Sequence, residues 1–133
     1  MTEILFYRHN GSFWGFTENG HTGYASAGED ILCSALSAMT MLVVNACEIA
    51  YASEVEYEVD EGATRIEVSC KEVLRGGDEK KRYAVCGLFE AYFYQLNDLT
   101  EEYYDNLSVN VIDKDPFESD AGPIGKNKIN VEE

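Results

Sequence analysis

Two short stretches rich in apolar and aromatic residues open the chain, with a turn signal between them. Residues 3–8 (EILFYR) have the composition of a β-strand, and residues 13–17 (FWGFT) have the same character. The Asn-Gly pair between them favours a tight turn, because both residue types tolerate a positive φ. The sequence therefore predicts a β-hairpin at the start of the chain.

A stretch whose apolar residues have helical spacing follows a loop that is rich in glycine. From residue 31 to about residue 51, apolar residues recur every three or four positions over a wide face, which is typical of a largely buried helix. Asp30 stands directly before this pattern, so we expect it to be the helix N-cap. The same spacing over residues 85–103 predicts a second long helix.

Alternating apolar and polar residues lie between the two predicted helices. Residues 54–60 place Val55, Tyr57 and Val59 on one face and acidic residues on the other. Residues 65–74 alternate similarly, so the two stretches predict a second hairpin with one face in water.

A last strand is predicted over residues 107–112. The resulting order, ββαββαβ, predicts a two-layer α+β domain in which two long helices pack on a mainly antiparallel sheet. We expect this single domain to span residues 1–112. Residues 113–133 are polar and contain both prolines, which predicts a mobile extension.

Charge and cysteine content narrow the function. The 133-residue chain carries a formal net charge of −15, which argues against binding to nucleic acid or to an anionic membrane surface. We find no signal peptide and no apolar run of about 18 residues, so we expect a cytoplasmic protein. The four cysteines are then reduced thiols, and their spacing contains no zinc motif. We expect no metal and no cofactor.

Cys33 is the cysteine whose position suggests chemistry. With Asp30 as N-cap, Cys33 lies near the third helical position, where free backbone N–H groups and the helix dipole favour a thiolate. His21 is upstream across a flexible loop and can act as the base, and Ser37 shares a helix face with Cys33. The free N–H groups at the helix start are candidate donors to an oxyanion.

A purely structural role is the competing interpretation, because cysteine is among the most buried residue types. Cys47, Cys70 and Cys86 lie within predicted helices or a strand, and we expect all three to be structural. His9 is next to the Asn-Gly turn and is expected to be a solvated loop residue.

A resemblance adds to this interpretation. Gly20-His21 and the downstream stretch GEDILCSALSAM closely resemble the signature of the bacterial ribosomal-processing cysteine proteases, the Prp family. The likeness continues through VVNACEI and LNDLTEEYYDNLSVNV and covers roughly residues 1–111. Three features depart from the family pattern: Ser34 replaces an alanine, the first hairpin is unusually aromatic, and the C-terminal tail is longer than usual.

The resemblance implies a cysteine endopeptidase that removes a short N-terminal extension from a basic large-subunit ribosomal protein, the twenty-seventh, by cutting after a pair of aromatic residues. It implies Cys33 as nucleophile and His21 as its partner, with Asp30 and Ser37 in support. It also implies a homodimer and a mobile active-site loop over residues 22–29. We assign Gly20, Thr22, Gly23 and Gly28 to this mobile loop region.

Two other functions remain open from the residues alone. One is a non-catalytic homodimeric interaction module in which the second helix forms the interface and Cys33 is inert. The other is a thiol hydrolase or transferase that uses the same Cys-His pair on a different acyl substrate.

Overall fold

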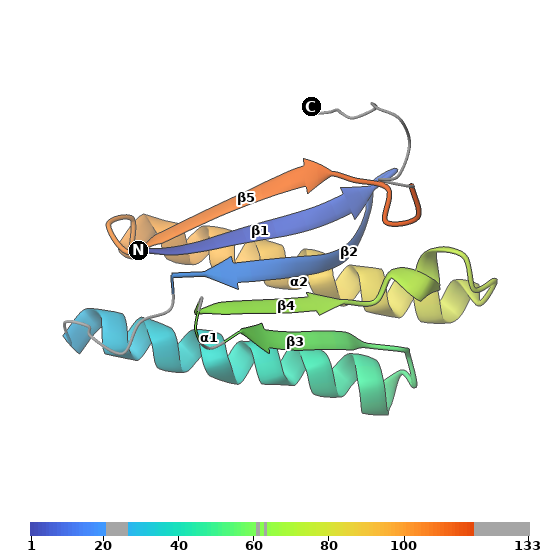
Figure 1. Cartoon of the computed structure of the whole chain (residues 1–133), viewed down its shortest axis with the longest axis horizontal. Coiled ribbons are helices and arrows are strands. Elements are labelled where there is room, and N and C mark those ends of the chain that lie inside the picture. Colours follow the sequence, from blue (N-terminus) through green and yellow to red (C-terminus); the bar gives the residue numbers. More distant parts are fainter. Residues whose placement is uncertain (21–26, 61, 63, 119–133) are drawn as a thin grey trace.

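The structure is a computed structural model, and it describes residues 1–20, 27–60, 62 and 64–118 of the chain. In this part of the chain, five strands and two long helices follow the predicted order ββαββαβ (Figure 1). The elements are β1 (Thr2–His9), β2 (Ser12–Asn19), α1 (Ala27–Asn45), the π-helical turn η1 (Ala46–Ala50), β3 (Glu56–Asp60), β4 (Arg65–Ser69), the 3₁₀ helix η2 (Lys71–Leu74), α2 (Glu79–Glu102) and β5 (Leu107–Asp113). The predicted α+β fold class is confirmed.

The five strands form one mixed sheet in the order β3-β4-β2-β1-β5. All neighbouring strands are antiparallel except β1 and β5, which run parallel. The predicted Asn-Gly turn joins β1 to β2, with φ angles of 50° at Asn10 and 82° at Gly11. These two positive angles match the twist of the flanking strands, so the turn sets the register of the opening hairpin.

Both helices contribute to a core on one face of the sheet. Phe6 of β1 and Phe16 of β2 are paired residues whose ring centroids lie 5.4 Å apart. The ring of Phe16 also lies 5.9 Å from the ring of Phe89 in α2. Leu32 and Leu36 of α1 are fully buried in the same cluster. The molecule is therefore the predicted two-layer arrangement, with helices on one face of the sheet.

The predicted start of the first helix is wrong. α1 begins at Ala27, so Asp30 is the fourth residue of the helix and not its N-cap. Gly28, which the sequence placed in the preceding loop, also belongs to α1. The sequence is compatible with this earlier start, because alanine has the highest helix propensity and acidic residues are favoured in a first turn.

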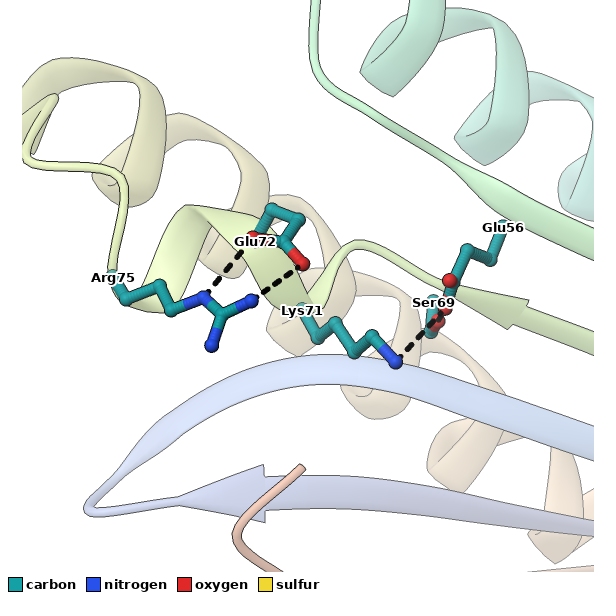
Figure 2. Close-up of polar contacts among 5 residues, drawn as sticks. All are labelled: Glu56, Ser69, Lys71, Glu72 and Arg75. Atoms are coloured by element: carbon teal, nitrogen blue, oxygen red, sulfur yellow. Dashed lines mark hydrogen bonds and ion pairs between the residues drawn. The ribbon is translucent and has the colours of Figure 1, made fainter. Parts of the chain in front are cut away.

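The second hairpin differs from its prediction in two ways. β4 ends at Ser69, and the predicted strand residues after it form η2, which buries Val73. Figure 2 shows the polar contacts around this change of structure, where the Ser69 hydroxyl donates to Glu56 Oε1 at 3.1 Å and the Lys71 ammonium lies 3.6 Å from the same oxygen. β3 is an edge strand with every residue exposed, including Val59 at 50%. The alternation predicted a buried face, but Tyr57 and Val59 on that face are 42% and 50% exposed.

The first residues of the predicted extension pack on the domain. The Lys114 N–H donates to the Arg8 carbonyl at 2.7 Å, and Trp14 Nε1 donates to the Lys114 carbonyl at 3.0 Å. Phe117 lies beneath the Arg75 guanidinium, 3.8 Å from ring centroid to Cζ. The chain from residue 114 to residue 118 is therefore attached to both the opening hairpin and the connection before α2.

Candidate active site

The structure places the predicted nucleophile in the second turn of α1. Cys33 is the seventh residue of the helix and is partly exposed. Ser37 follows one turn later and is exposed. His21, Thr22 and Gly23 lie outside the described residues, as does the side chain of Asp30.

The earlier helix start changes the chemistry available to Cys33. The unsatisfied N–H groups of a helix belong to its first turn, and the dipole effect on charged groups is confined to that turn. Cys33 lies beyond it, so the helix N-terminus stabilises its thiolate less than the sequence suggested. Likewise, the backbone amides of residues 31–33 lie inside the helix and are not available as oxyanion donors.

Burial separates Cys33 from the other three cysteines, all of which lie in the described part of the chain. Cys47, Cys70 and Cys86 are buried. Burial raises the pKa of Cys86 to about 11, and the neighbouring Cys47 thiol together with burial raises the pKa of Cys70. The hydrogen bond from Cys70 instead lowers the pKa of Cys47, while burial opposes that fall. Cys33 is the most exposed of the four cysteines, so its position best suits a reactive thiol.

Gly20 fixes the point where β2 passes into the stretch that carries His21. Its φ is +87°, and its N–H donates to the Thr64 carbonyl at 3.2 Å. A Cβ at this position would overlap the carbonyl oxygen of Met1. Only glycine meets both requirements, which explains why the Gly-His pair of the motif has glycine at its first position.

A buried polar cluster, which the sequence reasoning missed, joins β2 to both helices. The Glu18 side chain is only 2% exposed on the core face of β2. Thr40 of α1 donates its hydroxyl hydrogen to Glu18 Oε2 at 2.6 Å, and the Tyr92 hydroxyl of α2 lies 3.4 Å from the same oxygen. Burial raises the pKa of Glu18, and the hydrogen bonds from Thr40 and Tyr92 oppose that rise. The only signal in the sequence is a lone acid in a strand and a threonine within an apolar helix stripe.

Among the residues that the structure describes, no three His, Cys, Asp or Glu side chains come together as metal ligands. The segment Ile31–Ala50 is long and apolar enough to cross a membrane by length and composition. Leu32 and Leu36 on one side of it are buried in the core, whereas Ile31 and Leu42 on the other side are exposed.

Comparisons with known proteins agree with the geometry. The family model of the cysteine protease Prp matches residues 1–108. The crystal structure of SMU.848 from Streptococcus mutans is 27% identical, with a TM-score of 0.73 over 86% of this chain and 96% of that chain. The crystal structure of the ribosomal processing protease Prp from S. aureus with a substrate peptide shares the fold at 18% identity, with a TM-score of 0.70 over 84% of this chain and 100% of that chain.

A second S. aureus Prp structure, in complex with a covalently linked product peptide, has a TM-score of 0.67 and 18% identity over the same shares of both chains. A search of curated protein sequences finds no match. The family match covers Cys33, the partly exposed thiol, and all of the strands and helices up to the start of β5. The chain thus belongs to the Prp family of cysteine proteases.

Proposed function

We propose that this chain is a cysteine endopeptidase that removes a short N-terminal extension from the twenty-seventh protein of the large ribosomal subunit, cutting after a pair of aromatic residues. The observation that carries the proposal is Cys33, the partly exposed thiol among four cysteines, within the stretch that resembles the family signature. Two related structures hold a substrate peptide and a covalently linked product peptide, which supports a peptide as the substrate class. An enzyme with this substrate works in the cytoplasm.

In the proposed mechanism, His21 accepts the proton of the Cys33 thiol. The thiolate attacks the scissile carbonyl carbon, and the C=O electron pair moves onto oxygen. Collapse of this intermediate breaks the C–N bond, and His21 gives its proton to the leaving amine. A water molecule, deprotonated by His21, then attacks the thioester and releases the acid product and the thiolate.

The position of Cys33 gives His21 a larger role than a helix-terminal cysteine would need. Because the helix dipole acts weakly in the second turn, the imidazolium is the main group that stabilises the thiolate in this mechanism. Asp30 and Ser37 would support the pair from the same helix.

The negative charge of the protein favours a basic substrate. The chain has a net charge of −15, and Glu58 and Glu67 are directly opposite each other on the open face of the sheet. Glu56 adds a further carboxylate, offset in part by Lys71 (Figure 2). A ribosomal protein is basic, so we expect its encounter rate with this enzyme to fall as salt is added.

Cleavage of a peptide that copies the N-terminus of the host's own ribosomal protein tests the proposal. We expect native protein to cut after an aromatic pair, and Cys33→Ala and His21→Ala to abolish cutting at equal folded concentration. Ser34→Ala is the matched control, because Ser34 is the exposed neighbour of Cys33 and should retain activity. Failure of well-folded native protein to cut any such peptide would favour the non-catalytic interaction module.

We further propose that the protein is a homodimer that uses the outer face of α1. Ile31 and Leu42 lie on one stripe of this helix and are 62% and 64% exposed, and Ile49 in the adjoining turn η1 is 73% exposed. No charged residue stands between Asp30 and Glu48 in a chain that is otherwise highly charged. An uncharged apolar stripe of this length is typical of a protein interface. The second helix, by contrast, exposes tyrosines such as Tyr83.

Sedimentation equilibrium measures the oligomeric state directly. We expect native protein to be a dimer, Leu42→Glu to be a folded monomer, and Tyr83→Glu on α2 to remain a dimer. A monomeric native protein, or a dimer lost through Tyr83→Glu and retained in Leu42→Glu, would contradict the α1 interface.

A further inference from the structure

A carboxylate buried in a protein core is unusual and needs hydrogen-bond donors to offset its lost hydration. Glu18 is 2% exposed, and its neighbours across the sheet are Ile4 on β1 and Ile66 on β4. An ionised carboxylate in such surroundings is costly unless several donors meet it. The donors here come from the helices and not from the sheet.

The hydrogens of the cluster can satisfy the carboxylate without conflict. The Thr40 hydroxyl, 2.6 Å from Glu18 Oε2, donates its one hydrogen to that oxygen. The Tyr92 hydroxyl lies 3.2 Å from Thr40 Oγ1 and 3.4 Å from Glu18 Oε2, so its hydrogen points either to the threonine oxygen or to the carboxylate. The Glu18 carboxylate on the sheet is thus within hydrogen-bond distance of one hydroxyl group from each helix.

Thr40 interrupts the apolar stripe by which α1 enters the core. Leu36 precedes it by one turn and Val43 follows it by nearly one turn, and both are buried. Apolar contacts tolerate sliding along or around a helix axis better than a short, directional hydrogen bond does. The bond from Thr40 to Glu18 therefore fixes the position of α1 on β2 more closely than its leucines and valines do.

This bond also joins the helix that carries Cys33 to the strand β2. Thr40 is seven residues after Cys33, which places both residues on one side of α1, two turns apart. Glu18 is two residues before Gly20, the anchored end of β2, from which the chain continues to His21. A shift of α1 at Thr40 would move Cys33 relative to the end of β2.

We infer that Glu18, Thr40 and Tyr92 are positioning residues for peptide cleavage, because their buried hydrogen bonds fix the helix that carries Cys33 against the strand that leads to His21. This inference rests on the proposed function, in which these two residues act together. Positioning affects the chemical step more than substrate binding, since a displacement of about 1 Å can reduce a rate by about a hundredfold.

Peptide kinetics of three variants test the inference. Thr40→Val keeps the shape of the side chain and removes its donor, so we expect kcat to fall by about ten- to a hundredfold while KM stays within about twofold. Thr40→Ser restores the donor, and we expect it to recover most of kcat. Equal kcat values for native protein and folded Thr40→Val would overturn the inference.

An apolar triple variant separates positioning from simple stability. Glu18→Met, Thr40→Val and Tyr92→Phe together remove every polar atom of the cluster, and such replacements often keep or raise stability. We expect this variant to unfold at a urea concentration equal to or higher than that for native protein, and still to have a low kcat. Recovery of kcat together with stability would show that the cluster only stabilises the fold, and would overturn the inference.

The alkylation rate of Cys33 by iodoacetamide keeps this test independent of the protease proposal. Cys47, Cys70 and Cys86 are buried, so the rapid phase reports on Cys33. We expect Thr40→Val to change this rate by at least about threefold, and Thr40→Ser to restore it. If native protein cuts no peptide, the proposed function fails, while an unchanged alkylation rate in folded Thr40→Val would overturn the positioning inference.

Discussion

Replacement of Gly20 by alanine tests the junction between β2 and the stretch that carries His21. The φ of Gly20 is +87°, a region that residues with a Cβ rarely occupy. In addition, the new Cβ would overlap the carbonyl oxygen of Met1, so the backbone at the start of β1 must move. The substitution therefore carries two costs at one position.

The two costs can be estimated separately. Holding a non-glycine residue in the left-handed region costs about 1–2 kcal/mol. Moving Met1 strains the adjoining hydrogen bond from the Thr2 N–H to the Asn106 carbonyl, which is 2.8 Å long and contributes about 1 kcal/mol. We therefore expect Gly20→Ala to reduce the free energy of unfolding by about 2–3 kcal/mol.

Gly11→Ala is the matched control for this experiment. Gly11 has a φ of +82°, but a Cβ added there would meet no atom within 4 Å outside its immediate neighbours. This control should therefore lose only the conformational cost of about 1–2 kcal/mol. Urea unfolding of native protein and both variants, followed by circular dichroism, gives the three free energies. Equal losses for Gly20→Ala and Gly11→Ala would refute the close-approach reasoning.

Three further substitutions probe other parts of the structure. Burial raises the pKa of Glu18, so its charge is costly in the folded state and native stability should fall as pH rises from the ordinary glutamate range through that pKa. Glu18→Gln should lack this loss in urea titrations between about pH 4 and pH 8, and equal slopes for the two proteins would contradict the reasoning. Leu36→Ala empties a fully buried site and should cost about 2–5 kcal/mol in urea unfolding, whereas a cost near zero would show that the site is not packed. Phe117→Ala removes the ring beneath Arg75 and should cost about 0.5–1 kcal/mol, with faster amide exchange at Lys114 as its local readout; unchanged exchange would show that the ring does not hold this segment.

The sequence predicted the fold where local pattern and tertiary environment agree. The Asn-Gly turn at residues 10 and 11 has the positive φ angles that its residue types favour. The three-and-four spacing of α2 also corresponds to burial, since Val85, Phe89, Tyr92 and Leu96 all lie in the core. These signals needed no knowledge of the remaining chain.

The prediction was wrong where the structure of a segment depends on which other elements pack against it. The alternation of Val59 and its strand is real, but β3 forms the sheet edge, and nothing in a strand's own residues says whether a helix will cover it. The start of α1 was missed because Asp30 suits both an N-cap and a first turn. The buried role of Glu18 was missed because its donors on α1 and α2 are 22 and 74 residues away in sequence.

The two proposals about α1 concern opposite faces of one helix, and they predict different dependences on protein concentration. If a second copy covers the stripe that contains Leu42, dilution below the dimer dissociation constant should reduce specific activity, because α1 then loses one of its two supports. The bond between Thr40 and Glu18 lies within one chain, so the loss of kcat in Thr40→Val should persist at concentrations where the protein is fully dimeric. A kcat deficit in Thr40→Val that disappears at high concentration would mean that Thr40 acts by stabilising the dimer and not by placing Cys33 against β2.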